Sequence, residues 1–368
     1  MTSTEAHDYE RWLRKVYNEI AVNFGRAEPR RRMWTYLLGL PSATSEGRRN
    51  GNQFGTYDGE QRADGVQRLL TSAQWDEEAV RNDLRAMITR IGGASGGALF
   101  VSEVAFPKKG SQAVAAERQY CVETEKHENC QIGIILFYLT ASGQGFVLDR
   151  DLYLPKIWAD DRARRWRAGI PDDVVYRSKS VIAAEMVERT IRAGIVPRWV
   201  GHSIQCPDKQ TFRRIMQRNQ VPHVMSVTPG ELSRLRPDRA DGPGAPRTVG
   251  GTPVRETLLC GGTSLSRSRL ASPTPEGFGN FHVVASGEEQ AHYLAFTRQD
   301  TKLAEIAPVI EVLRNSRAYC RKAKQEIGLG YYEVRSWRGW YRHITLVIAG
   351  YTALEMARAE SQLSLVHV

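Results

Sequence analysis

The chain has 368 residues, of which 41% are hydrophobic and 25% charged, so it is long enough for two or three structural units and too apolar for a disordered protein. Its 51 lysines and arginines exceed its 41 aspartates and glutamates by a net charge of +10, which favours an anionic partner such as nucleic acid, although a solvated basic surface would give the same balance. There is neither a membrane-length apolar run nor a secretory signal, and the five cysteines lack the paired spacings of a disulfide framework or zinc site. We therefore expect a reduced, cytoplasmic protein with no membrane partner.

The N-terminal part of the chain has the periodicity of helices. Apolar residues recur at helical spacing, which predicts helices over residues 9–24, 30–40, 65–70 and 76–91. A turn rich in glycine and asparagine, GRRNGNQFG, separates the second helix from the third. This pattern fits a helical packing domain and a DNA-end-binding domain equally well.

After Gly92 the pattern changes to strands and then to alternating strands and helices. Residues 98–101, 113–121 and 131–139 resemble a meander of antiparallel strands. The alternation that follows is typical of an α/β protein: helix 181–193, strand 198–200, helix 209–218 and strand 223–227. A segment rich in Gly, Pro, Ser and Arg then leads to two strands and two helices, over 281–285, 292–296, 303–329 and 343–357.

Several motifs together resemble one protein family. They are FPKKG at 106–110, ERQYC at 117–121, ENCQIG at 128–133, DRDLYLPKIWADDRAR at 149–164 and KQEIGLGYYEVRSWRGWYRHITL at 324–346. With GVQRLL and WDEEAVRNDLR at 65–85, these motifs resemble the DDE transposases of bacterial insertion sequences, in the branch typified by insertion sequence 701. The resemblance implies an α/β fold with a ribonuclease H-like core (93–228 and 303–368), a helical N-terminal domain (1–92) and a β-rich insertion (229–302).

The family's chemistry uses three carboxylates that hold two divalent metals about 4 Å apart. Aligned on the motifs, the first acid position is Ser102, within LFVSEVAFPKKG, and the second is Ser203, at the end of WVGHS. The third, seven residues before Lys324, is Arg317. Hydroxyls are weak ligands and a guanidinium repels cations, so we expect no bound metal, no cofactor and no DNA strand transfer.

The resemblance also predicts a remodelled pocket. Ser102 and Ser203 should face each other, and Arg317 should approach them from its helix and bind a small anionic or carbonyl-bearing molecule between them, with help from Lys324. The alternative is that Arg317 turns to the surface and pairs with an acid such as Glu311 or Glu305. Hydroxyls of this kind become nucleophiles when a base reaches them.

Four further residues near these positions carry reactive groups. Glu103 and His202 are the nearest acid–base groups, although alternation along a strand directs them to the opposite face from the serines. Cys320 follows Arg317 by nearly one helical turn, where the guanidinium would favour the thiolate, and Cys206 follows Ser203 by three residues. Either thiol, or either serine, is a candidate nucleophile, and structural roles for both thiols stay open.

Basic residues in the motifs are candidates for contact with DNA phosphates. They are Lys108, Lys109, Arg335, Arg338, Arg342 and the run RARRWR at 162–167. Two tryptophans among them, Trp337 and Trp340, have an aromatic surface for stacking on bases and equally suit packing in a core.

These observations leave two classes of function. The first is a repurposed, metal-independent enzyme that acts on its substrate in the former catalytic pocket, for example in specialised metabolism. The alternative is a catalytically inactive DNA-binding protein that serves as a regulator or transposition inhibitor. The replaced acids and a less basic insertion favour the enzyme slightly.

Overall fold

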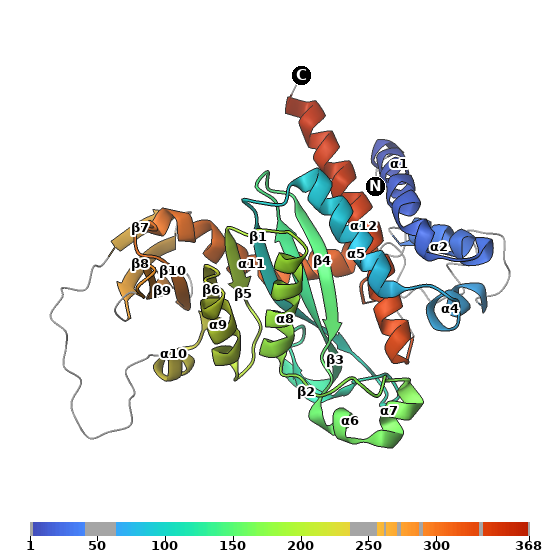
Figure 1. The fold of residues 1–368 in the computed structure, drawn as a ribbon, viewed down its shortest axis with the longest axis horizontal. Coiled ribbons are helices and arrows are strands. Elements are labelled where there is room, and N and C mark those ends of the chain that lie inside the picture. Colours follow the sequence, from blue (N-terminus) through green and yellow to red (C-terminus); the bar gives the residue numbers. More distant parts are fainter. Residues whose placement is uncertain are drawn as a thin grey trace.

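A computed structural model describes residues 3–40, 64–235, 256–260, 263–270, 274–286, 290–330 and 334–366. The predicted turn GRRNGNQFG and much of the Gly- and Pro-rich segment after residue 229 lie outside these ranges. The described strands form one ten-stranded sheet in the order β2-β3-β1-β5-β6-β10-β9-β8-β7, with β4 also paired to β3 (Figure 1). Their bounds are β1 Ala98–Pro107, β2 Glu117–Cys121, β3 Lys126–Leu139, β4 Gly145–Leu152, β5 Trp199–His202, β6 His223–Val227, β7 Glu256–Cys260, β8 Thr263–Arg269, β9 Phe278–Ser286 and β10 Ala291–Arg298.

The helices lie around this sheet and in a group beside it. Their bounds are α1 Ser3–Ile20, α2 Ala27–Gly39, α4 Asp64–Thr71, α5 Glu77–Gly92, α6 Lys156–Asp160, α7 Arg162–Ala168, α8 Lys179–Arg192, α9 Lys209–Arg218, α10 Pro229–Leu235, α11 Leu303–Ile327 and α12 Trp337–Val366. A short 3-10 helix, Ala21–Asn23, follows α1. The sequence predicted α9 and β6 with the observed bounds, whereas β4, α6, α7, β7 and β8 were missed.

The centre of the sheet is parallel, and its two ends are antiparallel. Strands β1, β5 and β6 run parallel. The chain enters β5 from α8 and β6 from α9, since a parallel pair needs a long crossover connection. On the other side of β1, strand β3 pairs antiparallel over ten residues. Both faces of β1 are buried, so its run of apolar residues is continuous rather than alternating.

The residues between α10 and α11 extend the central sheet. Strand β10 pairs antiparallel with β6 and is followed outward by β9, β8 and β7. The β-rich insertion predicted over 229–302 therefore continues the sheet of the core in its described part.

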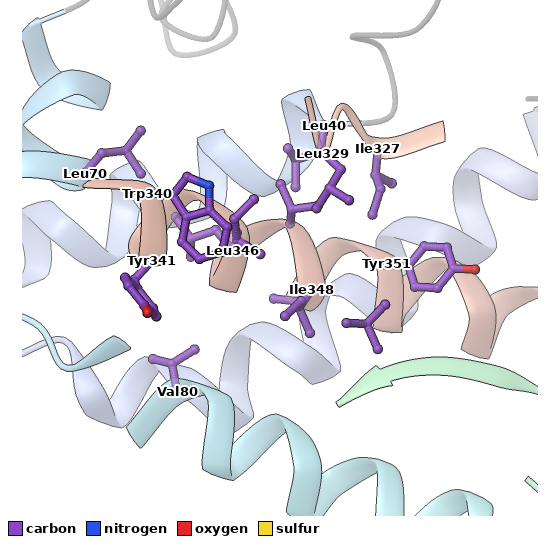
Figure 2. Packing of buried hydrophobic residues seen from close by; sticks show 14 of the residues in the cluster. Leu40, Leu70, Val80, Ile327, Leu329, Trp340, Tyr341, Leu346, Ile348 and Tyr351 are labelled. Carbon is purple, nitrogen blue, oxygen red and sulfur yellow. The ribbon is translucent and has the colours of Figure 1, made fainter. Parts of the chain in front are cut away.

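The last helix, α12, is packed among the N-terminal helices. Its apolar residues extend round its whole circumference, which is typical of a buried helix. In Figure 2, Trp340 of α12 lies beside Leu70 of α4, and Tyr341 of α12 lies over Val80 of α5. Helix α12 also contacts α1, α2 and β4, so this core joins the predicted domain 1–92 to the predicted segment 303–368. No helix in the described ranges has the combined length and apolarity to cross a membrane.

Candidate functional site at the centre of the sheet

Ser102 and Ser203 lie side by side where the parallel pairing of β1 with β5 ends. The last paired residues are Val101 and His202, and the Ser203 amide continues the pattern by donating to the Val101 carbonyl at 3.1 Å. The Ser203 hydroxyl lies 3.1 Å from the Ser102 hydroxyl and 3.2 Å from the Val101 carbonyl oxygen. The two serines therefore adjoin each other, as the resemblance implied.

The third side chain at this point is Cys320 of α11. Its thiol interacts with the Ser102 hydroxyl, and both residues are almost fully buried, with 2% and 4% of their surface exposed. Burial raises the pKa of the Cys320 thiol to about 12, and the hydroxyl of Ser102 offsets only part of this effect. The thiol is therefore protonated at neutral pH, which opposes the nucleophilic role considered for it.

Arg317 does not lie between the two serines. Its guanidinium forms an ion pair of 2.8 Å with the carboxylate of Glu125, in the turn between β2 and β3, and its side chain is 46% exposed. The predicted anchoring role is thus not supported. The physical reason is that Cys320 occupies the position that faces Ser102. A guanidinium in this buried contact would lose its hydration without gaining a carboxylate partner. Arg317 thus turns to the surface, as in the alternative prediction, but its partner is Glu125 rather than Glu305, which pairs with Arg198.

Glu103 and His202 face the opposite side of the sheet from the serines. Glu103 accepts from the Lys179 ammonium of α8 at 2.5 Å and from the Gln205 amide at 3.1 Å. His202 is fully buried against the ring of Phe212 at a centroid distance of 4.5 Å. Neither side chain is placed to exchange a proton with Ser102 or Ser203, so the structure does not support the predicted acid–base role for either residue.

Burial also fixes the protonation state of His202. Loss of solvent, with a smaller contribution from the nearby Lys209 charge, lowers the pKa of His202 to about 3. The imidazole is therefore neutral across the physiological range and acts as a core side chain.

Lys324 and Cys206 have structural partners. The Lys324 ammonium donates to the Ala105 carbonyl, pairs with the Glu123 carboxylate at 3.0 Å and lies over the Phe106 ring at 4.9 Å. These contacts tie α11 to β1, so the structure gives Lys324 no free charge for the ligand that we expected. The Cys206 thiol lies 3.1 Å from the Ser180 hydroxyl, and burial raises its pKa as well.

The residues at the centre do not fit a divalent metal pair. Two neutral hydroxyls and a protonated thiol supply none of the anionic oxygen ligands that magnesium requires. Over the described part of the chain, no group of three or more His, Cys, Asp or Glu residues is arranged to hold a metal ion.

A buried charge network on β4 was missed at the sequence level. Asp149 is fully buried and accepts from Arg81 at 3.2 Å and from Arg189 at 2.5 Å. Burial alone would raise the pKa of Asp149, but the adjacent arginines outweigh it and hold the pKa below its usual value. Its neighbour Asp151 accepts from the Tyr341 hydroxyl at 2.7 Å and from Arg177 at 3.2 Å. The signal was the charged run DRD inside an apolar strand, since buried charges need partners.

Three of the predicted DNA-contacting residues lie on an exposed basic surface. Lys109 follows β1, and Arg335 and Arg338 lie at the start of α12; all three are exposed, and the neighbouring Lys108 is half-buried. The two segments adjoin, because the Val114 amide of the loop after Lys109 donates to the Arg335 carbonyl at 2.9 Å. We call Lys108, Lys109, Arg335 and Arg338 the basic edge.

Arg342 is not part of this surface. It is 1% exposed, pairs with Glu77 at 3.2 Å and donates to the Trp75 carbonyl at 3.0 Å. Arg342 is therefore not placed on the basic surface, because its buried side chain joins α12 to α5. Trp337 and Trp340 are 8% and 0% exposed, so both are packing residues.

Comparison with known proteins identifies the family of the chain. The model of the DDE superfamily endonuclease family matches residues 20–260, which include β1, both serines and the charge network of β4. No curated protein matches the chain. The mixed α/β sheet with helices at the N-terminus agrees with the ribonuclease H-like fold of such nucleases. Over well more than half of its length, this chain is thus a member of the DDE superfamily endonucleases and belongs with the transposases of that kind.

Proposed function

We propose that this chain is a transposase-derived DNA-binding protein that has lost metal-dependent strand transfer and acts as a regulator or transposition inhibitor. One observation carries the proposal: where the family motifs place two catalytic acids, Ser102 and Ser203 are hydrogen-bonded to each other, and the nearby Cys320 thiol is protonated. A site without carboxylates cannot hold the two metals that activate the nucleophile and stabilise the leaving oxygen.

The DNA-binding half of the proposal rests on the basic edge. Lys109, Arg335 and Arg338 are exposed on two adjoining segments, and Arg338 forms a long ion pair of 3.7 Å with Glu77. Cations on one surface neutralise successive phosphates, and the release of condensed counterions then drives binding with little dependence on sequence.

The small-molecule enzyme that the sequence favoured has less support than this alternative. It needs a cationic anchor, a base or a reactive thiol next to Ser102. Arg317 pairs with Glu125, and His202 faces the opposite side of the sheet. Cys320 adjoins Ser102, but its thiol is protonated at neutral pH. None of these candidate groups supplies what that reaction would require, so we do not propose it.

A gel-shift series with duplex DNA at 50 mM and 200 mM salt tests the binding. We expect sequence-tolerant binding that weakens by orders of magnitude between the two salt concentrations. The double variant Lys109→Ala/Arg338→Ala should flatten the slope of log affinity against log salt by about 1.8, because each phosphate that is no longer neutralised accounts for about 0.9 of the slope.

The matched control removes two exposed positive charges elsewhere. Arg192 of α8 and Arg298 of β10 have side chains that are 74% and 64% exposed. The Arg192→Ala/Arg298→Ala variant should keep the wild-type slope, and equal flattening in both double variants would contradict a defined binding surface. Cleavage or strand transfer by the wild-type protein with Mn²⁺ would overturn the proposed loss of catalysis.

A further inference from the structure

A cavity between α1 and α2 has the chemistry of a ligand site and takes no part in the function proposed above. Its volume is about 520 Å³, within the range of small-molecule sites. In Figure 1 the two helices lie at the opposite end of the molecule from β7 and β8. The residues used below come from α1 (Arg14, Tyr17 and Asn18) and α2 (Arg30, Arg31 and Trp34).

The charge of the cavity lining is positive. Three arginines line it, and none of the described lining residues is an aspartate or glutamate. Among the described residues, Glu28 forms an ion pair with Arg32, and Glu10 forms one of 3.4 Å with Arg14 at an exposed position. The Arg30 guanidinium is held in place by its Nε–H, which donates to the Phe24 carbonyl at 2.6 Å. Such a lining favours an anion, and arginine recognises phosphate through paired hydrogen bonds.

The same cavity has an aromatic wall. Trp34 and Tyr17 are half-buried and meet edge to face, with ring centroids 5.3 Å apart and planes at 80°. The guanidinium of Arg14 already lies over the Trp34 ring, 4.8 Å from its centroid. Planar cations and planar heterocycles favour the same aromatic faces, so the wall is suited to stacking. The exposed amide of Asn18 is both donor and acceptor for the edge of such a ring.

We infer that this cavity binds a nucleotide, with its phosphate among the three arginines and its base against Trp34 and Tyr17. The chemistry is the same for a free nucleoside phosphate and for the unpaired terminal nucleotide of a strand. The site lies on α1 and α2 and shares no residue with the basic edge, so it stands independently of the DNA binding proposed above.

Calorimetric titration with AMP, adenosine and inorganic phosphate tests this inference. Stacking of one base contributes about 1–3 kcal/mol, which corresponds to a factor of about 5 to 150 in affinity. We therefore expect AMP to bind at least five times more tightly than inorganic phosphate and more tightly than adenosine. Equal affinities for AMP and phosphate, or no AMP binding at 1 mM, would overturn the nucleotide assignment.

Variants on α1 supply a matched comparison. Arg14 and Lys15 are adjacent and both exposed, but the Lys15 ammonium lies over the Trp12 ring at 3.7 Å, outside the cavity lining. Arg14→Ala should weaken AMP binding at least tenfold, and Lys15→Ala should leave it within twofold. Equal weakening by the two variants would show a diffuse charge effect and contradict the site.

Two further arms identify the source of the nucleotide and separate this inference from the proposed function. A 5′-phosphorylated single-stranded oligonucleotide that displaces AMP assigns the site to a strand end, and failure to displace it assigns the site to a free nucleotide. The Lys109→Ala/Arg338→Ala variant should bind AMP as the wild type does. Loss of AMP binding in that variant would contradict an independent site on α1 and α2.

Discussion

Two groups of polar residues are buried in the sheet, and they have opposite electrostatic character. At the centre, Ser102, Ser203 and Cys320 carry no formal charge and satisfy one another through short contacts. On β4, by contrast, Asp149 is fully charged and fully buried, and arginines from α5 and α8 compensate it. The buried carboxylate of Asp149 stays ionised because the positive charges of the two arginines compensate its negative charge. The three side chains at the centre are neutral and need no such compensation.

The largest test of this contrast is removal of the β4 carboxylate. Asp149→Asn should destabilise the fold by about 3–5 kcal/mol, because Arg81 and Arg189 are left partly buried without their anion. Chemical denaturation measures the loss. The control Asp160→Asn removes an exposed ion pair with Lys156 and should cost less than about 1 kcal/mol. A loss of less than about 1 kcal/mol for Asp149→Asn would mean that the network contributes little to stability.

Acids placed at the neutral centre should convert it into a metal site. The triple variant Ser102→Asp/Ser203→Asp/Cys320→Glu brings three carboxylates together, and a divalent cation relieves their repulsion. We expect Mn²⁺ at 100 times its Kd to stabilise this variant by about 2.7 kcal/mol, measured as a rise in Tm.

Two controls sharpen this test. The wild type should not respond to Mn²⁺. The variant that carries Arg317→Glu in place of Cys320→Glu should respond less, because residue 317 faces Glu125. A larger response of the Arg317→Glu version would show that residue 317, as the family spacing implies, is the third position of the site.

Acid should destabilise the protein through its buried histidines. Burial lowers the pKa of His202 and of His343 to about 3, whereas histidine in an unfolded chain has a pKa of about 6.5. Between these values the unfolded state binds a proton that the folded state does not, so the free energy of unfolding falls as pH falls below 6.5. Each such histidine contributes about 2 kcal/mol of loss between pH 7 and pH 5.

Replacement of one histidine isolates its share of this effect. His202→Phe should reduce the difference in unfolding free energy between pH 7 and pH 5 by about 2 kcal/mol. An unchanged difference in the His202 variant would contradict a neutral, buried imidazole.

The smallest expected effect concerns Arg317. Its ion pair with Glu125 is exposed on both sides, so Arg317→Ala should change the free energy of unfolding by less than about 1 kcal/mol. It should also leave the reactivity of Cys320 toward iodoacetamide unchanged, because the guanidinium does not approach that thiol. A faster or slower reaction would place Arg317 closer to the centre than we describe.

Patterns along the chain were enough to predict much of the fold. Helical periodicity predicted α1, α2, α4 and α5, and for α9 the predicted bounds were those observed. The motifs predicted that Ser102 and Ser203 would adjoin. That prediction succeeded because the neighbouring parallel strands β1 and β5 place Ser102 and Ser203 side by side at the end of their pairing. The residue at each of these positions is known from the sequence.

Short elements with charged or irregular sequence were harder to predict. Strand β4 was missed because DRD interrupts its apolar pattern, and partners remote in sequence, among them Arg81 and Arg189, make that run compatible with burial. Strand β8 was missed because its sequence, TSLSRSR, is as polar as a loop, whereas β9 beside it supplies the hydrogen bonds.

The sequence by itself determined the family resemblance, the helical N-terminus, the α/β alternation and the absence of acids at residues 102 and 203. Tertiary structure alone decided which side of α11 meets the sheet, and so put Cys320 rather than Arg317 against Ser102. It also buried Arg342 and set α12 among the N-terminal helices. The physical reason is that sequence spacing fixes only the order of residues around a helix. The rotation of the helix about its axis is set by burying its apolar surface and pairing its charges, and both depend on residues far away in the chain.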